Sequence, residues 1–183
     1  MTTPTQQTQA ALRARLTDGS LAGHWTLDPA RSTATLRSKS MWGLAPVKGV
    51  FHDLEGDGTV SAAGEVTGRV AVAARTVDTK NAKRDTHLRS ADFFLAAEYP
   101  AITFSVAAMV PSGQGVTVSG TLTVRDVSRP LSFPATVALA EGGEVVLDAA
   151  VPVERSQFGL TWNQLGMASM HSTITIHAVF TRS

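Results

Sequence analysis

The sequence predicts an all-β fold: an antiparallel eight-stranded barrel with a short crossover helix and a short N-terminal helix. From residue 24 onward, most segments alternate apolar and polar residues, the pattern of strands with one buried face. Turns rich in glycine, proline and aspartate separate these segments at short intervals, as in hairpins. One polar stretch, residues 76–94, interrupts the alternation and is the place for the crossover helix.

Composition limits the classes of function. A chain of 183 residues with 43% apolar residues can bury the core of one domain. Its net charge of +1 gives no reason to expect nucleic acid as a partner. Because it contains no cysteine, disulfides, thiolate catalysis and cysteine–zinc sites are excluded.

The beginning of the chain predicts a helix outside the barrel. Residues 5–16 can form it, with Leu12 and Leu16 on one side and Gly19 as its stop. Because this apolar stripe is thin, we expect it to dock weakly, and we divide the chain into a lead-in, 1–22, and a barrel domain, 23–183. We find neither the features of a secretory signal nor a run long enough to span a membrane, so we expect a cytoplasmic protein with no integral membrane segment.

The expected strands follow from the alternation. In chain order they cover residues 24–27, 32–41, 47–54, 66–74, 102–107, 116–125, 131–139, 145–153 and 173–181. A turn is expected at Gly56-Asp57-Gly58. From these nine segments we predict about eight strands joined mostly by hairpins, which close into a barrel or pack as a sandwich.

The polar stretch holds charged residues at high density. Asp78 or Thr79 can cap a short helix there. One interpretation is a solvated crossover helix. The sharper one is a structural polar lock that closes one end of the barrel, with Arg84 buried and paired with Asp85 or Asp92.

The inward face mixes bulky residues with small ones, which leaves space for one ligand in an eight-stranded barrel. Alternatively, the tryptophans and phenylalanines fill that space. The residues expected to line an apolar cavity are Leu36, Phe51, Val70, Val72, Phe104, Gly120, Leu122, Phe133, Ala135, Val137, Leu147, Val151, Phe158, Trp162, Ile174 and Ile176. In residues 155–172, methionines and aromatic residues form either an apolar lip at the mouth of this cavity or a loop tucked under the barrel.

The sequence contains few features that indicate catalysis. The histidines show no metal-ligand spacing, and nucleophile-elbow, P-loop and dinucleotide-binding motifs are absent. We therefore predict no catalytic residue, no metal and no cofactor. The alternative is an enzyme or pathway accessory protein that uses the same cavity, with His52, Arg84 or His171 reaching inside. In a third class, a stress-response or interaction protein, the cavity is incidental.

Several motifs together resemble one family. They are W-x-L-D-x-x-x-S at Trp25–Ser32, V-K-G-V-F at 47–51, a long motif from Val77 to Phe93 that includes Asn81, Arg84, Asp85, His87 and Asp92, G-x-L-T-V-R at 120–125, and Arg155-x-x-Phe158-Gly159. They resemble the YceI-like polyisoprenoid-binding family, whose barrel is lipocalin-like. The chain departs from the family pattern in lacking a signal, in Asp126 at a position of glycine, and in Met-Ala-Ser-Met-His before the last strand.

The resemblance implies a function as well as a fold. It implies a barrel whose pore holds a long isoprenoid chain, often in a homodimer, with no catalytic residues. The expected partner is thus a hydrophobic small molecule, and a bound isoprenoid lipid takes the place of a cofactor. At the turn after residue 124, we expect a residue with positive φ at or beside Asp126, and a gain in stability for Asp126→Gly.

Overall fold

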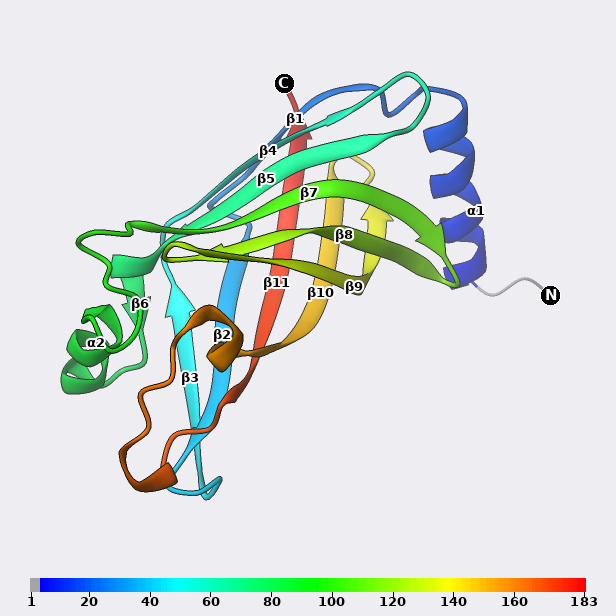
Figure 1. The fold of residues 1–183 in the computed structure, drawn as a ribbon. Helices are drawn as coiled ribbons and strands as arrows, with labels where there is room; N and C mark the ends of the chain where they lie inside the picture. Colours follow the sequence, from blue (N-terminus) through cyan, green and yellow to red (C-terminus); the bar gives the residue numbers. More distant parts are fainter. Residues whose placement is uncertain (1–3) are drawn as a thin grey trace.

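The computed structural model describes residues 4–183, which form two α-helices and one antiparallel sheet (Figure 1). The helices are α1 (Pro4–Thr17) and α2 (Ala82–Arg89), and short 3₁₀ turns span Ala74–Thr76, Arg155–Phe158 and Gln164–Gly166. The strands are β1 (Gly23–Leu27), β2 (Thr33–Ser40), β3 (Ala45–Phe51), β4 (Leu54–Val60), β5 (Val66–Ala73), β6 (Val77–Asp78), β7 (Ala101–Ser112), β8 (Gly115–Val124), β9 (Val127–Leu139), β10 (Val145–Glu154) and β11 (His171–Arg182).

Eight of these strands form a closed ring, which confirms the predicted antiparallel barrel. The order is β1-β4-β5-β7-β8-β9-β10-β11, and β11 returns to β1 through the pairs Trp25–Arg182 and Leu27–Phe180. β11 is long enough to pair with both β1 and β2 along the same edge. As a result, β2 and β3 leave the ring together as a two-stranded ribbon, which extends away from β1 and β4 in Figure 1.

The expected turn at Gly56-Asp57-Gly58 is wrong, because these residues lie inside β4. They pair with β5, where Gly58 faces Gly68. A Cβ on Gly68 would lie 2.6 Å from the carbonyl oxygen of Asp57, so the two backbones approach too closely for a side chain. The reversal comes later, where Gly64 has φ +83 and its N–H donates to the Ser61 carbonyl.

The turn between β8 and β9 is a tight one. Arg125 has φ 56, which confirms a positive φ beside Asp126. Asp126 itself does not have a positive φ. Glycine at this position would therefore relieve no backbone strain, and the stability gain expected from Asp126→Gly is no longer supported. The Arg125 side chain also bridges to the segment after α2, where Nη1 donates to the carbonyls of Ala91 and Phe93.

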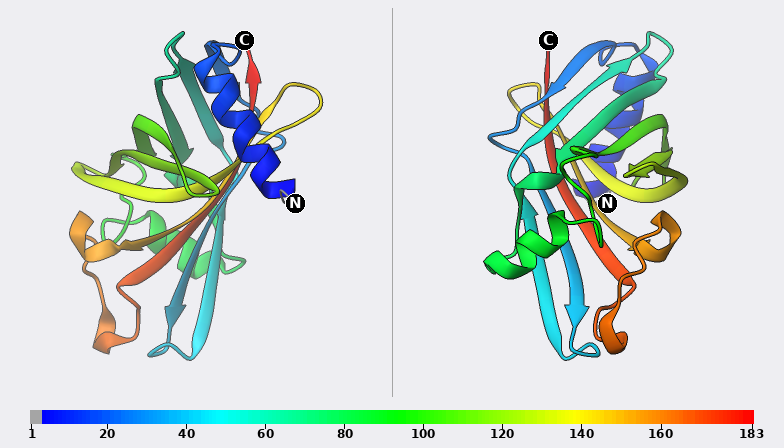
Figure 2. Two further views of the ribbon diagram at one scale, coloured as in Figure 1. Left: turned by 90° about the vertical axis from the view of Figure 1, so that its right-hand side faces the viewer. Right: turned by 60° about the vertical axis from the view of Figure 1, so that its left-hand side comes forward.

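Helix α1 packs against one end of the barrel (Figures 1 and 2), where it contacts β9. Leu12 and Leu16 are buried in a cluster with Leu21 and Trp25, so the thin apolar stripe is enough to seat the helix. The Trp25 indole N–H donates to the Leu21 carbonyl at 3.0 Å and fixes the connection. The division of the chain after residue 22 stays a prediction.

The strands β9 and β10 separate along half of their length. Their pairing runs from Leu139–Val145 to Thr136–Asp148 and stops there. Among the strands that the structure describes, the remaining part of β9 pairs with β8 alone. The 3₁₀ turn Arg155–Phe158 lies beside this seam, where Arg129 Nε donates to the Gln157 carbonyl at 3.1 Å.

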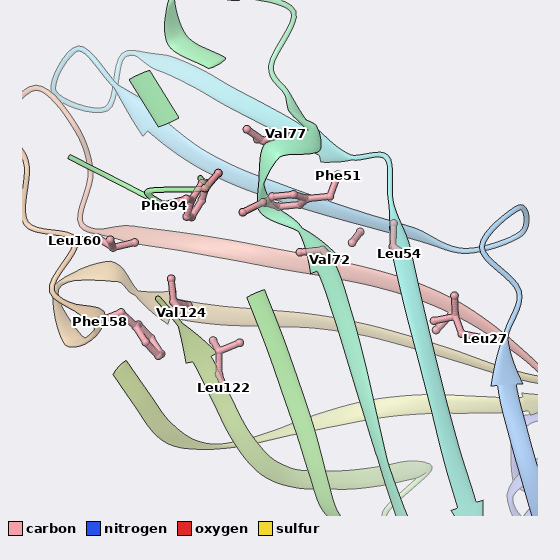
Figure 3. Close-up of a cluster of buried hydrophobic side chains, with 14 residues drawn as sticks. Leu27, Phe51, Leu54, Val72, Val77, Phe94, Leu122, Val124, Phe158 and Leu160 are labelled. Atoms are coloured by element: carbon pink, nitrogen blue, oxygen red, sulfur yellow. The ribbon is translucent and has the colours of Figure 1, made fainter. Parts of the chain in front are cut away.

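The buried apolar side chains form two clusters, one at each end of the barrel. Figure 3 shows the cluster near α2, where Phe51 of β3, Val72 of β5 and Leu122 of β8 converge. The rings of Phe51 and Phe94 lie 6.0 Å apart. The other cluster contains the side chains of α1.

Candidate functional site

An apolar cavity of about 630 Å³ lies within the barrel and touches both clusters. This volume is within the range of pockets that hold one small ligand. Leu12, Leu16 and Leu21 line it at the α1 end. Inward-facing residues such as Ile174 and Ile176 are only half-buried, because they face open space rather than other side chains.

Most of the residues expected in the lining are found there. They are Leu36, Phe51, Val70, Val72, Phe104, Leu122, Phe133, Val137, Leu147, Val151, Phe158, Trp162, Ile174 and Ile176. Their part in ligand binding remains a prediction.

Gly120 and Ala135 are not in the lining, and the packing explains both corrections. At Gly120, a Cβ would lie 2.8 Å from Cζ of Phe104, so the phenylalanine ring covers the glycine. Ala135 belongs to the cluster of Leu12 and Leu16, on the strand against which α1 packs. Alternation correctly predicts that both residues face inward, but it does not show what lies against them.

Polar residues enter the lining in two regions. One is the β4–β5 pair, around Gly58 and Gly68. The other is the end away from α1, where α2, β2 and the 155–170 segment meet. There the lining includes Lys39, Lys83, Arg84, His87, Gln164 and Ser169, together with Trp162 and Met167. The cavity therefore has an apolar body and a cationic end.

Arg155 organises the segment that borders this end. Its side chain is buried and donates to the carbonyls of Leu160 (2.6 Å), Ser169 (2.8 Å) and Ala168 (3.2 Å). Burial lowers the pKa of the guanidinium from its ordinary value, but an arginine keeps its charge. Among the residues that the structure describes, no carboxylate lies within 4 Å of it. The guanidinium also lies 5.4 Å from the centre of the Phe93 ring.

The polar network at α2 differs from the predicted lock. Asp85 is buried and accepts from the Thr79 amide (2.9 Å) and hydroxyl (2.6 Å). Arg84 donates to the same hydroxyl at 2.9 Å and to the Thr79 carbonyl. The predicted pairing of Arg84 with Asp85 or Asp92 is wrong, because within residues 4–183 Arg84 has no salt bridge and Thr79 stands between it and Asp85.

The cap of α2 is also a correction. Asn81 caps the helix by accepting from the Arg84 amide at 3.0 Å, not Asp78 or Thr79. Asp78 instead binds the Lys80 ammonium at 2.7 Å, with the His52 ring at 3.3 Å. Lys80 is the main reason why the pKa of Asp78 lies far below its ordinary value.

The contacts of the His87 side chain were not predicted from the sequence. Its ring packs edge-on against Trp162 at 4.3 Å and Phe93 at 5.1 Å, and its Nε2 lies 2.8 Å from the Asp92 carboxylate. These contacts join α2 to the 155–170 segment. The only signal for them was that His87 and Asp92 belong to the same long motif.

The polar residues considered for catalysis do not converge. His52 binds Asp78 on the outside, and His171 is exposed at the start of β11. Arg84 reaches the lining, where its donors bind Thr79. In the part of the chain that is described, histidine and carboxylate residues form no group that could hold a metal ion, and neither helix has the length and apolar character to cross a membrane.

Comparisons with known proteins point to one family. The model of the YceI-like domain matches residues 25–181. Protein YceI of Escherichia coli O157:H7 is 36% identical over 95 residues, which are 51% of this chain and 50% of that protein. A UPF0312 protein of Shewanella baltica (strain OS185) is 34% identical over 125 residues, 66% of this chain and 65% of that protein. The match thus spans half to two thirds of the relatives' length.

Solved structures share the fold. BcnA of Burkholderia cenocepacia superimposes with a TM-score of 0.76 at 23% identity, over 84% of this chain and 98% of that one. A polyisoprenoid binding domain from Saccharophagus degradans gives 0.70 at 17% identity, over 87% and 98%. The YCEI protein of Campylobacter jejuni gives 0.63 at 26% identity, over 75% and 85%.

Proposed function

Because the chain belongs to the YceI-like domain family, we propose that it is a non-catalytic protein that carries or stores a long apolar ligand, a polyisoprenoid, in its barrel. The observation that supports this most is the apolar cavity of about 630 Å³. The related fold from Saccharophagus degradans is described as a polyisoprenoid binding domain.

The energetics of transfer favour a long ligand. One buried methylene contributes about 0.8 kcal/mol, so a five-carbon isoprene unit contributes at most roughly 4 kcal/mol. Association costs about 4–15 kcal/mol, and micromolar binding needs about 8 kcal/mol net. An apolar ligand therefore needs about three units or more if its head group contributes little. A cavity that extends from α1 to the cationic end provides the continuous apolar wall that such a chain requires.

Co-purification tests the proposal directly. The protein is purified without detergent, extracted with organic solvent, and the extract is analysed by mass spectrometry against an extract of an unrelated protein prepared alongside. We expect a polyprenyl species in stoichiometric amount. If the extract is empty, and the purified protein also fails to bind added polyprenyl alcohols, the carrier function is wrong. An enzyme or accessory protein acting on a smaller apolar molecule would then be the next hypothesis.

Two further predictions concern the state of the protein in the cell. A homodimer is the expected assembly, and light scattering coupled to gel filtration measures it. The cytoplasm is the expected compartment, and fractionation of the native host with an antibody against this chain tests that expectation.

A further inference from the structure

Two turns at one extremity of the molecule expose large apolar side chains. They are the β2–β3 turn and the 3₁₀ turn Gln164–Gly166, which lie at the lower end of Figure 1. Met41, Trp42, Leu44 and Leu165 are 51%, 65%, 83% and 79% exposed, and we call them the apolar tip. Of the large apolar residues that the structure describes as exposed, only Val110 lies elsewhere. Such concentration marks an interaction site, whereas single exposed apolar residues are normal.

The two turns are joined into one structure. The Trp42 indole N–H donates to the Leu165 carbonyl at 3.1 Å, and the Trp42 amide donates to the Met167 carbonyl at 3.3 Å. The tip therefore presents its side chains as one rigid projection rather than as two independent loops.

The backbone of the tip is strained. Met41, Trp42 and Leu165 have φ values of 51, 54 and 52, which are uncommon for residues with bulky side chains. Glycine or asparagine would adopt this conformation more readily. Bulky residues are thus held in a costly conformation while their side chains point away from the core, a combination that indicates function at the tip.

The ribbon that carries the tip is cationic. Arg37, Lys39 and Lys48 are exposed on this ribbon, and Arg37 pairs directly with Lys48 across the strands. None of them has a carboxylate within 4 Å among the described residues, and segments 33–51 and 155–172 contain no aspartate or glutamate. Like charges opposite each other in a sheet are unfavourable unless an outside anion balances them.

We propose that the apolar tip inserts into the surface of a lipid bilayer that contains anionic lipids. Tryptophan is enriched at the level of lipid head groups, where leucine and methionine reach the acyl chains. Lysine and arginine just behind the apolar residues are attracted to anionic head groups. Figure 2 shows both turns at the lower end of the molecule, away from α1, so that they are free to meet a surface.

The position of the tip connects it to the cavity. Lys39, Ser40 and Met167 line the cavity. Ser40 directly precedes the tip residue Met41, and Lys39 and Met167 each lie two residues from a tip residue. A protein docked by its tip would therefore turn the cationic end of the cavity toward the bilayer. The inference goes beyond the proposed carrier function, because docking is measurable on ligand-free protein and does not require that any ligand be bound.

Vesicle binding tests the proposal. The full chain is mixed with vesicles of phosphatidylcholine, with and without phosphatidylglycerol, and bound protein is separated by flotation. We expect binding to the anionic vesicles that weakens as salt is added. The variant Trp42→Asn/Leu44→Ser/Leu165→Asn should bind at least about tenfold more weakly. Asparagine tolerates positive φ, so this variant should fold, and its melting temperature verifies that.

Charge variants and matched controls complete the experiment. Lys39→Glu/Lys48→Glu should lose binding to anionic vesicles by about tenfold or more. Val110→Ser removes an exposed apolar residue far from the tip, and Arg13→Glu removes a cation on α1. Both controls should bind like the unchanged protein.

Three results would overturn the proposal. The first is absence of vesicle binding by the unchanged protein. The second is equal binding by the folded tip variant. The third is a dimer of the unchanged protein that the tip variant loses while neither binds vesicles, because the tip would then be an interface between two copies of the chain.

Discussion

At the scale of single residues, the organising group is a buried cation that has no carboxylate partner within residues 4–183. Arg155 is held by the carbonyls of Leu160, Ala168 and Ser169, so one side chain fixes the course of a segment that contains little regular structure. The sequence contained a signal for Arg155, because the residue belongs to the Arg155-x-x-Phe158-Gly159 motif. It contained none for its partners, since backbone carbonyls carry no sequence identity.

Replacement of Arg155 should destabilise the whole protein. Arg155→Met leaves one buried and two partly buried carbonyls without this donor, and we expect a loss of about 3 kcal/mol. In a chain of this size that corresponds to roughly 6–12 °C in melting temperature. Arg155→Lys should recover only a small part, because an ammonium does not reproduce the planar fork. Arg69→Met, which removes an exposed pair with Glu55, is the control and should change little. An equally small shift at Arg155 would contradict the role assigned to it.

The ion pairs of Arg31 should make the stability of the protein depend on pH in the acidic range. It lies 2.7 Å from Asp28 and 2.9 Å from Glu144, and its hydrogen bonds lower the pKa of both carboxyl groups from their ordinary values of 3.8 and 4.5. A lowered folded-state pKa contributes stability that is complete above the ordinary value and is lost as pH falls below it.

The urea midpoint of unfolding should therefore decrease as pH falls below about 4.5. Arg31→Gln should have a lower midpoint at neutral pH and a flatter decrease on acidification, because the largest cause of the lowered pKa of both carboxyl groups is removed. Parallel curves for the two proteins would show that the acid dependence comes from other carboxyl groups.

At the scale of elements, the alternation of apolar and polar residues predicted most of the strands and which face of each strand points inward. It failed at β4, because Gly56-Asp57-Gly58 has the composition of a turn. In the structure, Gly58 faces Gly68 and allows the backbones of β4 and β5 to approach closely. It also failed for Ala135, because alternation does not reveal that α1 covers this part of β9. Both failures concern contacts between elements, which a local pattern does not contain.

The seating of α1 is testable through its buried leucines. Leu12→Ala removes a side chain that is 3% exposed, and large-to-small changes in a core cost about 2–5 kcal/mol. We expect a clear decrease in the melting temperature, whereas Arg13→Ala on the exposed side of α1 should have little effect. If Leu12→Ala only increases the protease sensitivity of residues 1–22 and leaves the main transition unchanged, the helix belongs to a separate lead-in, as the division of the chain predicts.

At the scale of the whole molecule, the proposed carrier function depends on the space inside the barrel rather than on reactive groups. The family resemblance and the small inward residues predicted a cavity, and the structure contains one. The sequence did not predict its boundaries, because these depend on α1 and on the 155–170 segment, which lie at opposite ends of the barrel (Figure 1).

Filling the cavity should separate binding from stability. Ile176 faces the cavity and pairs with Ala34 and Ala149, so Ile176→Trp places its extra atoms in open space. We expect little change in melting temperature and loss of binding of a fluorescent isoprenoid probe. Ala135→Phe is the matched control. It adds a ring beneath α1, where overpacking costs about 1–3 kcal/mol or more. A strong destabilisation by Ile176→Trp would mean that the cavity does not accept added volume.

The seam between β9 and β10 has a consequence for motion within the barrel. Beyond Thr136 and Asp148, neither strand supplies hydrogen bonds to the other, so this wall can open without breaking a strand ladder. Local opening is the process that amide hydrogen exchange measures. Residues 149–154 of β10 still pair with β11, and residues 127–135 of β9 still pair with β8. We therefore expect faster exchange in these two stretches than in residues 103–106 of β7 and in β8, which have partners on both sides. If a bound chain bridges the seam, these amides should slow more than any others in the barrel.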